Sequence, residues 1–388
     1  MSLKTKIIDN LKNINGWKTN RKLIVLSIDD YGNLRIGSKE IITQIEKLGV
    51  AISSRFDKYD SLETTEDLYM LYEALTSVKD SFSNHPIFTC YALPCNLNYE
   101  AILKSNFEEY SYEQLPVTYE KLAQLYPNYY QNTWNLWQEG IKMKLLSPEF
   151  HGREHVNIEE LKYQSKNNYK LLKLLFENRS YSFLPELNGN RIYTAAFSYN
   201  NLIETSEFES VISTGLEEFE KVFNKKAVVF TPPSQQFPPF LEVNLYKYGL
   251  KAIDKPFFAK VHLGSGKFKK SFTSTKFNKK NNIYNIVRNV VFEPSEKTNY
   301  DTVNLAMNQI EIAFNLNRVA NISSHRINFS GFISEENRKI GLSNLKILLN
   351  RIVMKWPDVE FISASDLINI ISKFIDPVTI KKIHLVKE

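Results

Sequence analysis

A nearly continuous apolar run, LIVLSI at Leu23–Ile28, leads directly into the polar segment DDYGN at Asp29–Asn33. Unbroken apolar runs of this length are typical of strands that are covered on both faces, as in a parallel sheet. Asp and Gly are residues that favour turns, so the strand is expected to end where the polar segment begins. The sequence thus predicts a buried strand with two carboxylates at its carboxyl end.

The rest of the chain repeats this alternation of apolar strand and amphipathic helix. Further strand candidates are Val50–Ser53, Pro86–Leu93, Ser147–His151, Ala227–Phe230, Leu250–Ile253, Asn285–Phe292, Ala320–Ser324 and Val359–Ser363. Helix candidates are Gly37–Leu48, Ser61–Lys79, Ile158–Asn178, Glu204–Phe223, Pro239–Tyr248, Thr302–Leu316 and Glu335–Met354. Alternating strands and helices predict an α/β fold with a parallel sheet. Six to eight such units in one continuous series favour a single (β/α) barrel domain over residues 1–388 rather than two open sheets.

Residues 100–146 differ from what precedes them, because they are rich in Tyr, Glu, Gln and Trp. Helical periodicity at Leu122–Leu125 and Trp134–Met143 predicts two helices, which we expect to form an insertion that caps one face of the barrel. Trp134 and Trp137 lie three residues apart. They could stack against sugar rings, or they could pack the core of the insertion.

The composition indicates a soluble globular protein: 43% of the 388 residues are apolar and 24% are charged. The net charge of +6 favours anionic partners only weakly, and nucleic-acid binding is not expected. Cys90 and Cys95, the only cysteines, indicate neither a disulfide framework nor a structural zinc site. We expect a cytoplasmic protein, because the sequence has no signal-peptide core and no apolar run of about 20 residues. The oligomeric state is left open.

Residues 263–282 form a Gly-, Ser- and Lys-rich segment, which we expect to be a loop. Its basic and aromatic side chains are interleaved: Lys267, Phe268, Lys269, Lys270, Phe272, Lys276, Phe277, Lys279 and Lys280. A solvated loop accounts for this composition. A surface that binds an anionic polymer, such as an acidic polysaccharide or nucleic acid, accounts for it too.

Three segments that follow predicted strands can carry chemistry. Adjacent carboxylates at Asp29 and Asp30 repel each other and need a cation or hydrogen bonds, unless they simply form a turn. His151 and His155 share one face if their segment is helical, and both imidazoles can then converge on one metal ion. His325 follows the strand Ala320–Ser324 and could reach the same rim, or it could be an ordinary loop histidine.

Taken together, these segments resemble the polysaccharide deacetylase family, the NodB-homology deacetylases. They occur in that family's chain order, and the likeness extends from about Leu23 to His325. The segment DDYG also looks like the DDFG of YdjC-like chitooligosaccharide deacetylases. The resemblance implies a distorted (β/α) barrel of mostly seven strands. It also implies metal ligands at Asp30, His151 and His155, a general base at Asp29 and a general acid at His325.

The chain departs from the family's pattern in its third motif, where an Arg beside a Pro orients the base. Here the segment Phe230–Ser234 reads FTPPS and contains no Arg. Arg153, Arg288 and Arg326 are the candidates to replace it. Gly152 also stands where the family usually has Ser or Thr.

The function expected from these residues is metal-dependent removal of an acetyl group from an N-acetylated sugar or polysaccharide. Two His and one carboxylate suit zinc, although Ni, Co and Mn accept similar ligands. Cleavage of a glycosidic or phosphoester bond at the same metal is one alternative. A non-catalytic carbohydrate-binding protein is the other. No G-x-S-x-G, Walker A or G-x-G-x-x-G motif indicates a serine hydrolase or a nucleotide-binding protein.

Overall fold

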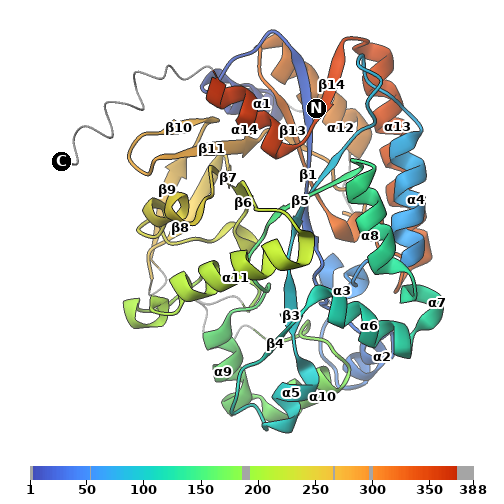
Figure 1. The fold of residues 1–388 in the computed structure, drawn as a ribbon, viewed down its shortest axis with the longest axis vertical. Helices are drawn as coiled ribbons and strands as arrows, with labels where there is room; N and C mark the ends of the chain where they lie inside the picture. The colour runs from blue at the N-terminus through green and yellow to red at the C-terminus, as the bar shows by residue number, and fades with distance from the viewer. Residues whose placement is uncertain (1–2, 53, 186–192, 265–266, 297–299, 374–388) are drawn as a thin grey trace.

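The computed structural model of this chain describes residues 3–52, 54–185, 193–264, 267–296 and 300–373 (Figure 1). Its central element is a ring of parallel strands. These are β1 (Lys22–Tyr31), β2 (Phe88–Ala92), β5 (Leu146–Phe150), β6 (Val229–Phe230), β7 (Ala252–Pro256), β11 (Ile283–Arg288), β12 (Val290–Val291) and β13 (Ala320–His325). None of the helices in the described part of the chain is long and apolar enough to cross a membrane.

The ring closes through β11 and β12, which are separated only by Asn289. Strand β11 pairs with β7 on one side, and β12 pairs with β13 on the other, so a single segment joins the two edges of the sheet. Strand β14 (Val359–Ile362) pairs with the first residues of β1. Strand β2 pairs with the residues of β1 that follow them. The predicted fold class, a distorted (β/α) barrel, is confirmed.

Both faces of β1 are buried, as its unbroken apolar run predicts. Ile24, Leu26 and Ile28 belong to the large apolar cluster that the strands share with the surrounding helices. Leu23 and Val25 point the other way, into a second cluster with residues of β2, β6, β7, β11 and helix α14 (Ala364–Lys373). Successive residues of a strand face opposite sides, so the two clusters are the outer and inner faces of the barrel wall.

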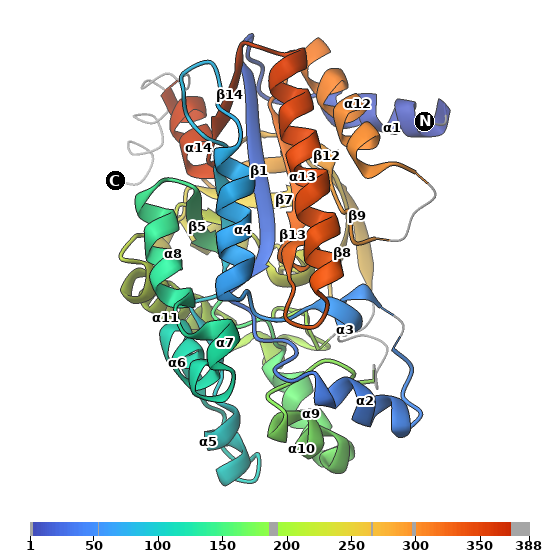
Figure 2. The same cartoon turned by 90° about the vertical axis from the view of Figure 1, so that its right-hand side faces the viewer.

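Helices cover much of the outside of the barrel. They include α4 (Thr65–Thr76), α8 (Thr133–Lys142), α11 (Phe208–Phe223), α12 (Thr302–Asn315) and α13 (Glu335–Lys355), and α4 and α13 lie side by side in front of β1 in Figure 2. Helix α1 (Leu3–Ile14) lies at the opposite end from the carboxyl ends of the strands (Figure 1). Neither α1 nor α14 was anticipated from the sequence.

The carboxyl ends of the strands point downward in Figure 1, and most of the additional elements gather there. They are α2 (Glu40–Lys47), α3 (Arg55–Tyr59), β3 (Cys95–Leu97), α5 (Tyr99–Lys104), β4 (Tyr112–Gln114), α6 (Leu115–Leu125), α7 (Pro127–Tyr130), α9 (Ile158–Asn167) and α10 (Tyr169–Glu177). This end of the barrel therefore carries the elaborate loops in which barrel enzymes place their chemistry.

Residues 100–146 contain four helices where two were expected. The additional helices are α5 and α7, and proline stands in the first turn of both α6 and α7. Trp137 on α8 is fully buried, and its indole N–H donates a 2.8 Å hydrogen bond to Glu63. Of the two interpretations of the tryptophans, core packing is the one that holds for Trp137.

Other predicted elements differ in detail. Val50–Ile52 is not a strand, and Ser53 lies outside the described residues. The helix expected at Ile158–Asn178 breaks at Asn168, whose backbone leaves the helical region. The 3-10 helix η1 (Leu202–Thr205) precedes α11, and another, η3 (Glu242–Tyr248), replaces the helix expected at Pro239–Tyr248. Two more 3-10 turns are η2 (Pro233–Gln235) and η4 (Arg326–Phe329).

The expected loop at 263–282 was wrong. Strands β8 (Phe258–His262) and β9 (Phe268–Phe272) form an antiparallel hairpin, and β10 (Lys276–Asn278) pairs with β11. Residues 265 and 266 lie outside the described residues. Phe residues are mixed with Lys and Ser in this segment, and aromatic residues favour strands even beside many basic residues.

Candidate metal centre

Both carboxylates of the Asp29–Asp30 pair face one cavity at the end of β1. Neighbouring residues of a regular strand would point to opposite sides. Asp30 instead has a positive φ of 71°, and the pairing of β1 with β2 shifts register between Ile28 and Tyr31. Asp is one of the few residues other than Gly that adopts this backbone conformation, so the local irregularity is what brings the two acids together.

The segment after Asp30 is held by a buried ion network. Arg326 donates hydrogen bonds of 2.8 Å to the Asn33 carbonyl, 2.9 Å to Glu63 and 2.5 Å to Asp60. Glu63 in turn accepts the backbone N–H of Gly32 at 3.2 Å. Arg326 therefore supports the backbone of the site, and none of its hydrogen bonds to described residues goes to Asp29.

His151 and His155 converge on Asp30 without the helix that their spacing suggested. His151 follows the last residue of β5, and helix α9 begins only at Ile158, so the two imidazoles come from a loop. Gly152 between them has a φ of 108°, and a Cβ there would lie 3.2 Å from Pro233. The family's usual Ser or Thr at this position would be strained in this backbone.

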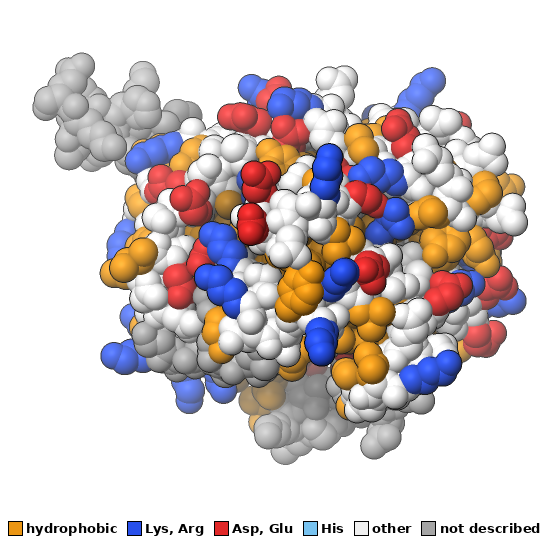
Figure 3. Space-filling view, turned by 90° about the horizontal axis from the view of Figure 1, so that it is seen from below, with side chains coloured by type: hydrophobic (Ala, Val, Ile, Leu, Met, Phe, Trp, Pro, Cys, Tyr) orange, Lys and Arg blue, Asp and Glu red, His pale blue; other side chains and the backbone are white. Residues whose placement is uncertain are grey.

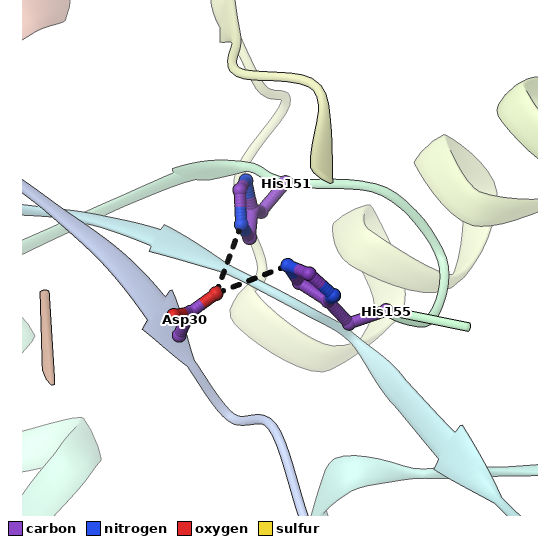
Figure 4. Close-up of side chains that lie close together, drawn as sticks. All are labelled: Asp30, His151 and His155. Carbon is purple, nitrogen blue, oxygen red and sulfur yellow. Dashed lines mark hydrogen bonds and ion pairs between the residues drawn. The ribbon is translucent and has the colours of Figure 1, made fainter. Parts of the chain in front are cut away.

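The three side chains form a compact, buried cluster that could hold a metal ion (Figure 4). The Oδ1 atom of Asp30 lies 3.3 Å from Nε2 of His151 and 3.1 Å from Nε2 of His155, and the three candidate ligand atoms all lie within 4.8 Å of one another. Ligands about 2.0–2.1 Å from a tetrahedral zinc ion are roughly 3.3 Å apart. These separations fit a divalent metal ion of that size.

The surroundings of the cluster also fit metal ligands. Nδ1 of His151 donates a 2.7 Å hydrogen bond to the Thr231 carbonyl, which leaves the Nε2 lone pair directed at the cluster. Nδ1 of His155 is buried without a hydrogen-bond partner among the described residues. Burial alone would raise the pKa of Asp30, but the two imidazoles lower it well below its ordinary value. Asp30 is thus held as a carboxylate.

Asp29 is bound by Arg288, one of the three candidate arginines. Nη1 and Nη2 of Arg288 each donate a 2.7 Å hydrogen bond to one oxygen of Asp29, while Nε donates a 2.7 Å bond to Asp254. Burial favours the neutral acid, yet the charge of Arg288 keeps the pKa of Asp29 below its usual value. Arg153, by contrast, pairs with its neighbour Glu154 at 2.6 Å.

His325 lies at the end of β13, on the other side of Asp29. Its Nε2 is 3.9 Å from Asp29 Oδ2, and its Nδ1 donates a 2.6 Å hydrogen bond to Glu293. Glu293 is itself fixed by Arg55 at 2.7 Å and Asn328 at 2.8 Å. Burial lowers the pKa of His325, but the charge and hydrogen bond of Glu293 outweigh it and raise the pKa to about 9. His325 is therefore protonated at neutral pH.

The candidate ligands, Asp29 and His325 line one cavity of about 340 Å³. Its walls are formed by Asp29, Asp30, Arg35, Phe56, His151, His155, Thr194, Pro232, Ser234, Gln235 and His325. A second cavity of about 520 Å³ shares Arg35, Phe56 and Thr194 with it. Volumes of this order accommodate a small ligand or part of a larger one.

Three residues of the site were missed from the sequence. Asp254 and Glu293 each follow directly on a predicted strand, Leu250–Ile253 and Asn285–Phe292, as Asp29 does. That position was the signal that could have found them. Thr231 also follows a predicted strand, and besides holding His151 it accepts a 3.2 Å hydrogen bond from Arg288.

No family model matches the sequence, and no curated protein matches it in sequence. Solved structures of similar fold include a Mycobacterium smegmatis protein described as a polysaccharide deacetylase, with 8% identity, a TM-score of 0.44, and coverage of 92% of this chain and 93% of that one. Puue allantoinase also has 8% identity and a TM-score of 0.44, covering 91% of each chain. A GH57 branching enzyme from Thermococcus kodakaraensis has 13% identity and a TM-score of 0.42, covering 90% of this chain and 71% of that one. With likenesses this low, the function of the site has to be argued from its own residues.

Proposed function

We propose that this protein is a metal-dependent hydrolase that removes an acetyl group from an N-acetylated sugar or polysaccharide. The observation that carries the proposal is the paired geometry around Asp29. A carboxylate kept ionised by Arg288 stands beside the cluster of Asp30, His151 and His155, and a protonated His325 faces it from the other side. Hydrolysis of an amide needs a base and an acid in this arrangement.

Asp30, His151 and His155 would hold the metal ion, and zinc is the ion that two imidazoles and one carboxylate suit best. Such an ion supplies Lewis-acid chemistry, because it lowers the pKa of water and polarises an acyl oxygen. All three side chains line the same cavity, so a substrate in that cavity would lie beside the ion.

Asp29 is the proposed general base. Its bidentate pair with Arg288 fixes the orientation of the carboxylate and keeps it deprotonated, so it can accept a proton from the attacking water. Arg288 comes from β11 and not from the segment after β6, where the family's third motif would place the arginine. Arg288 would thus orient the base from another strand, as the arginine of the family's third motif does.

His325 is the proposed general acid. The Nδ1–H bond to Glu293 directs Nε2 into the cavity, and the raised pKa keeps a proton on that nitrogen at neutral pH. Departure of an amine requires such a proton, because an unprotonated amide anion is a very poor leaving group. Glu293 is then a positioning residue that acts through His325.

A direct test measures bound metal and acetate release on the same preparation. Purified protein should contain close to one divalent ion per chain and should release acetate from at least one member of a panel of N-acetylated glycans. Protein that binds no zinc or other divalent ion would rule out the proposal. Release of sugar or phosphate from glycoside or phosphoester substrates, without acetate, would favour cleavage of another bond. Glycan binding with no turnover would favour a non-catalytic carbohydrate-binding protein.

A further inference from the structure

One segment of the chain carries a concentrated positive charge. Residues 255–292 contain eight Lys and one Arg and no Asp or Glu. Nine of the 49 basic residues lie there, so the remaining 40 are outnumbered by the 43 acidic residues and the rest of the chain has a net charge of −3. In the space-filling view of the carboxyl end, acidic and basic side chains are intermixed (Figure 3). The acid-free segment therefore differs from the general surface.

The hairpin of β8 and β9 arranges part of this charge on one exposed face. Lys260 pairs directly with Lys270 across the two strands, and Phe258 pairs with Phe272. Side chains of directly opposed residues lie on the same face, about 5 Å apart at Cβ. The two phenylalanine rings are in contact, with centroids 5.2 Å apart, although Phe272 remains 69% exposed.

This arrangement is unfavourable for the hairpin by itself. Like charges directly opposed across a strand pair are destabilising, and exposed aromatic rings lose the benefit of burial. Within the described residues, neither Lys260 nor Lys270 has an acidic partner, unlike Lys255, which binds Glu242 at 2.5 Å. An anionic ligand would remove the repulsion, and a ligand with flat apolar surfaces would cover the rings.

The hairpin stands against the wall of the metal cavity. Its opposite face, with Ala259, Val261 and Ser271, lines a small cavity together with Pro232 and Gln235. Pro232 and Gln235 also line the cavity of the metal cluster. The loop after β6 thus lies between the hairpin and the site, and the face with Lys260 and Lys270 is turned away from that loop.

We propose that the β8–β9 hairpin binds an anionic polysaccharide, with Lys260 and Lys270 contacting its acidic groups and the Phe258–Phe272 pair stacking against its sugar rings. This deepens the proposed function and rests on it for the choice of a glycan: one acetylated sugar would occupy the metal cavity, while acidic sugars from another part of the same polymer lie on the outward face of the hairpin. Sugar rings present flat C–H faces to aromatic side chains, and their acidic groups attract lysine.

The test compares the affinities of the full-length protein for two N-acetylated probes. Hyaluronan alternates N-acetylglucosamine with a carboxylate-bearing sugar, whereas chitin oligosaccharides are neutral. Wild-type protein should bind hyaluronan more tightly, and added salt should reduce that preference. The Lys260→Gln/Lys270→Gln variant should bind hyaluronan roughly 10- to 30-fold more weakly, with unchanged affinity for chitin oligosaccharides. Phe272→Ala should weaken the binding of both probes.

Two further variants separate charge from general disruption. Lys260→Arg/Lys270→Arg keeps both positive charges and should bind hyaluronan like the wild type. Lys226→Gln/Lys339→Gln removes the same charge from exposed positions elsewhere and should also leave the affinity unchanged. If this distant pair weakened binding as much as the hairpin pair, net charge alone would be responsible and the hairpin site would be disproved.

The binding measurement does not depend on turnover, so its result tests the hairpin site separately from the proposed function. Lysine-dependent hyaluronan binding without acetate release would support the hairpin site and refute the deacetylase. Acetate release with equal hyaluronan affinity in the wild type and Lys260→Gln/Lys270→Gln would refute the hairpin site alone. Tighter lysine-dependent binding of polyuridylate RNA, or of phosphatidylserine vesicles, than of hyaluronan would overturn the assignment to an anionic glycan.

Discussion

Arg288 at the end of β11 clamps Asp29 at the end of β1 with two parallel 2.7 Å hydrogen bonds, one to each carboxylate oxygen. The two residues are 259 positions apart in the chain, and Asp254 holds the same guanidinium from the far side at 2.7 Å. Bidentate pairs of this kind fix both the orientation and the charge of a carboxylate. The proposed base is therefore positioned by Arg288, and no local sequence motif identifies that partner.

Replacement of Arg288 by Lys should lower kcat for acetate release about 100-fold, because a single ammonium cannot hold both oxygens of Asp29. The metal content, measured by elemental analysis, should stay close to that of the wild type, since Arg288 does not contact the cluster. Arg153→Lys is the matched control. Because Arg153 pairs with Glu154, this substitution should leave kcat within a few-fold of the wild-type value. Equal losses in the two variants would argue against a specific role for Arg288.

Substitution of the cluster should separate metal binding from catalysis. Asp30→Ala and His151→Ala should abolish metal binding, because each removes one of the three candidate ligands that the described residues offer. Asp29→Asn should retain the metal but lose turnover, because the amide cannot accept the proton from water. Elemental analysis and acetate release on the same samples test both statements. An Asp29→Asn protein that turned over at the wild-type rate would exclude Asp29 as the base.

Bound metal should also raise the thermal unfolding temperature of the wild type, because a ligand that binds only the folded state stabilises it. Chelation followed by scanning calorimetry should show a lower Tm, which added zinc restores. Asp30→Ala should show no response to either treatment. A chelator-sensitive Tm in that variant would place the metal elsewhere in the molecule.

The rate should fall at alkaline pH, because the proposed acid acts in its protonated form and His325 has a pKa of about 9. Glu293→Gln removes the charge that raises this pKa, so the alkaline limb of kcat/KM should move to lower pH. The pKa of a folded histidine above its unfolded value of about 6.5 also stabilises the fold. That stabilisation is complete below about pH 6.5 and is lost as the pH rises through about 9. An alkaline limb that did not move in Glu293→Gln would remove His325 from the mechanism.

Arg326→Gln should lower the free energy of unfolding by about 3–5 kcal/mol, because it leaves Glu63 buried without a cationic partner and Asp60 with only the 3.8 Å ion pair to Arg35 among the described residues. Denaturant titration measures the loss. Arg351, which is exposed and contacts only Asn304 among the described residues, is the control, and its change to Gln should cost less than about 0.5 kcal/mol. A small effect at Arg326 would mean that water replaces the network.

The sequence determined the elements whose side-chain pattern is strong and local. The unbroken run at Leu23–Ile28 indicates a strand buried on both faces, and most of the other strands were located to within a few residues. Weak or mixed patterns were misread: β9, at Phe268–Phe272, reads FKKSF without a regular alternation and was expected to be part of a loop. Helices such as α7, with only four residues, have too few turns to show a period.

The candidate ligands could be found because strand ends in a parallel sheet share one edge, so Asp30, His151, His155 and His325 were expected at the same rim. The convergence of His151 and His155 was expected only if their segment were helical, whereas a loop that turns at Gly152 brings them together. The choice among Arg153, Arg288 and Arg326 was left open by the sequence. All three follow or lie in elements near the rim, and nothing local distinguishes them.

The pattern of strands and helices by itself thus indicated a barrel with acids and histidines after its strands, because burial pattern and strand direction are encoded residue by residue, while the roles of those residues were implied by the family resemblance. Only the tertiary structure decided that Arg288 holds Asp29, that Glu293 holds His325, and that Arg326 belongs to the support of the loop after Asp30. Each of these ion pairs joins segments that are distant in sequence. The pair of Arg288 with Asp29 forms because the ring closes through β11 and β12, and Arg326 reaches its partners because β13 pairs with β1. Both pairings join distant parts of the chain and are encoded in no single segment.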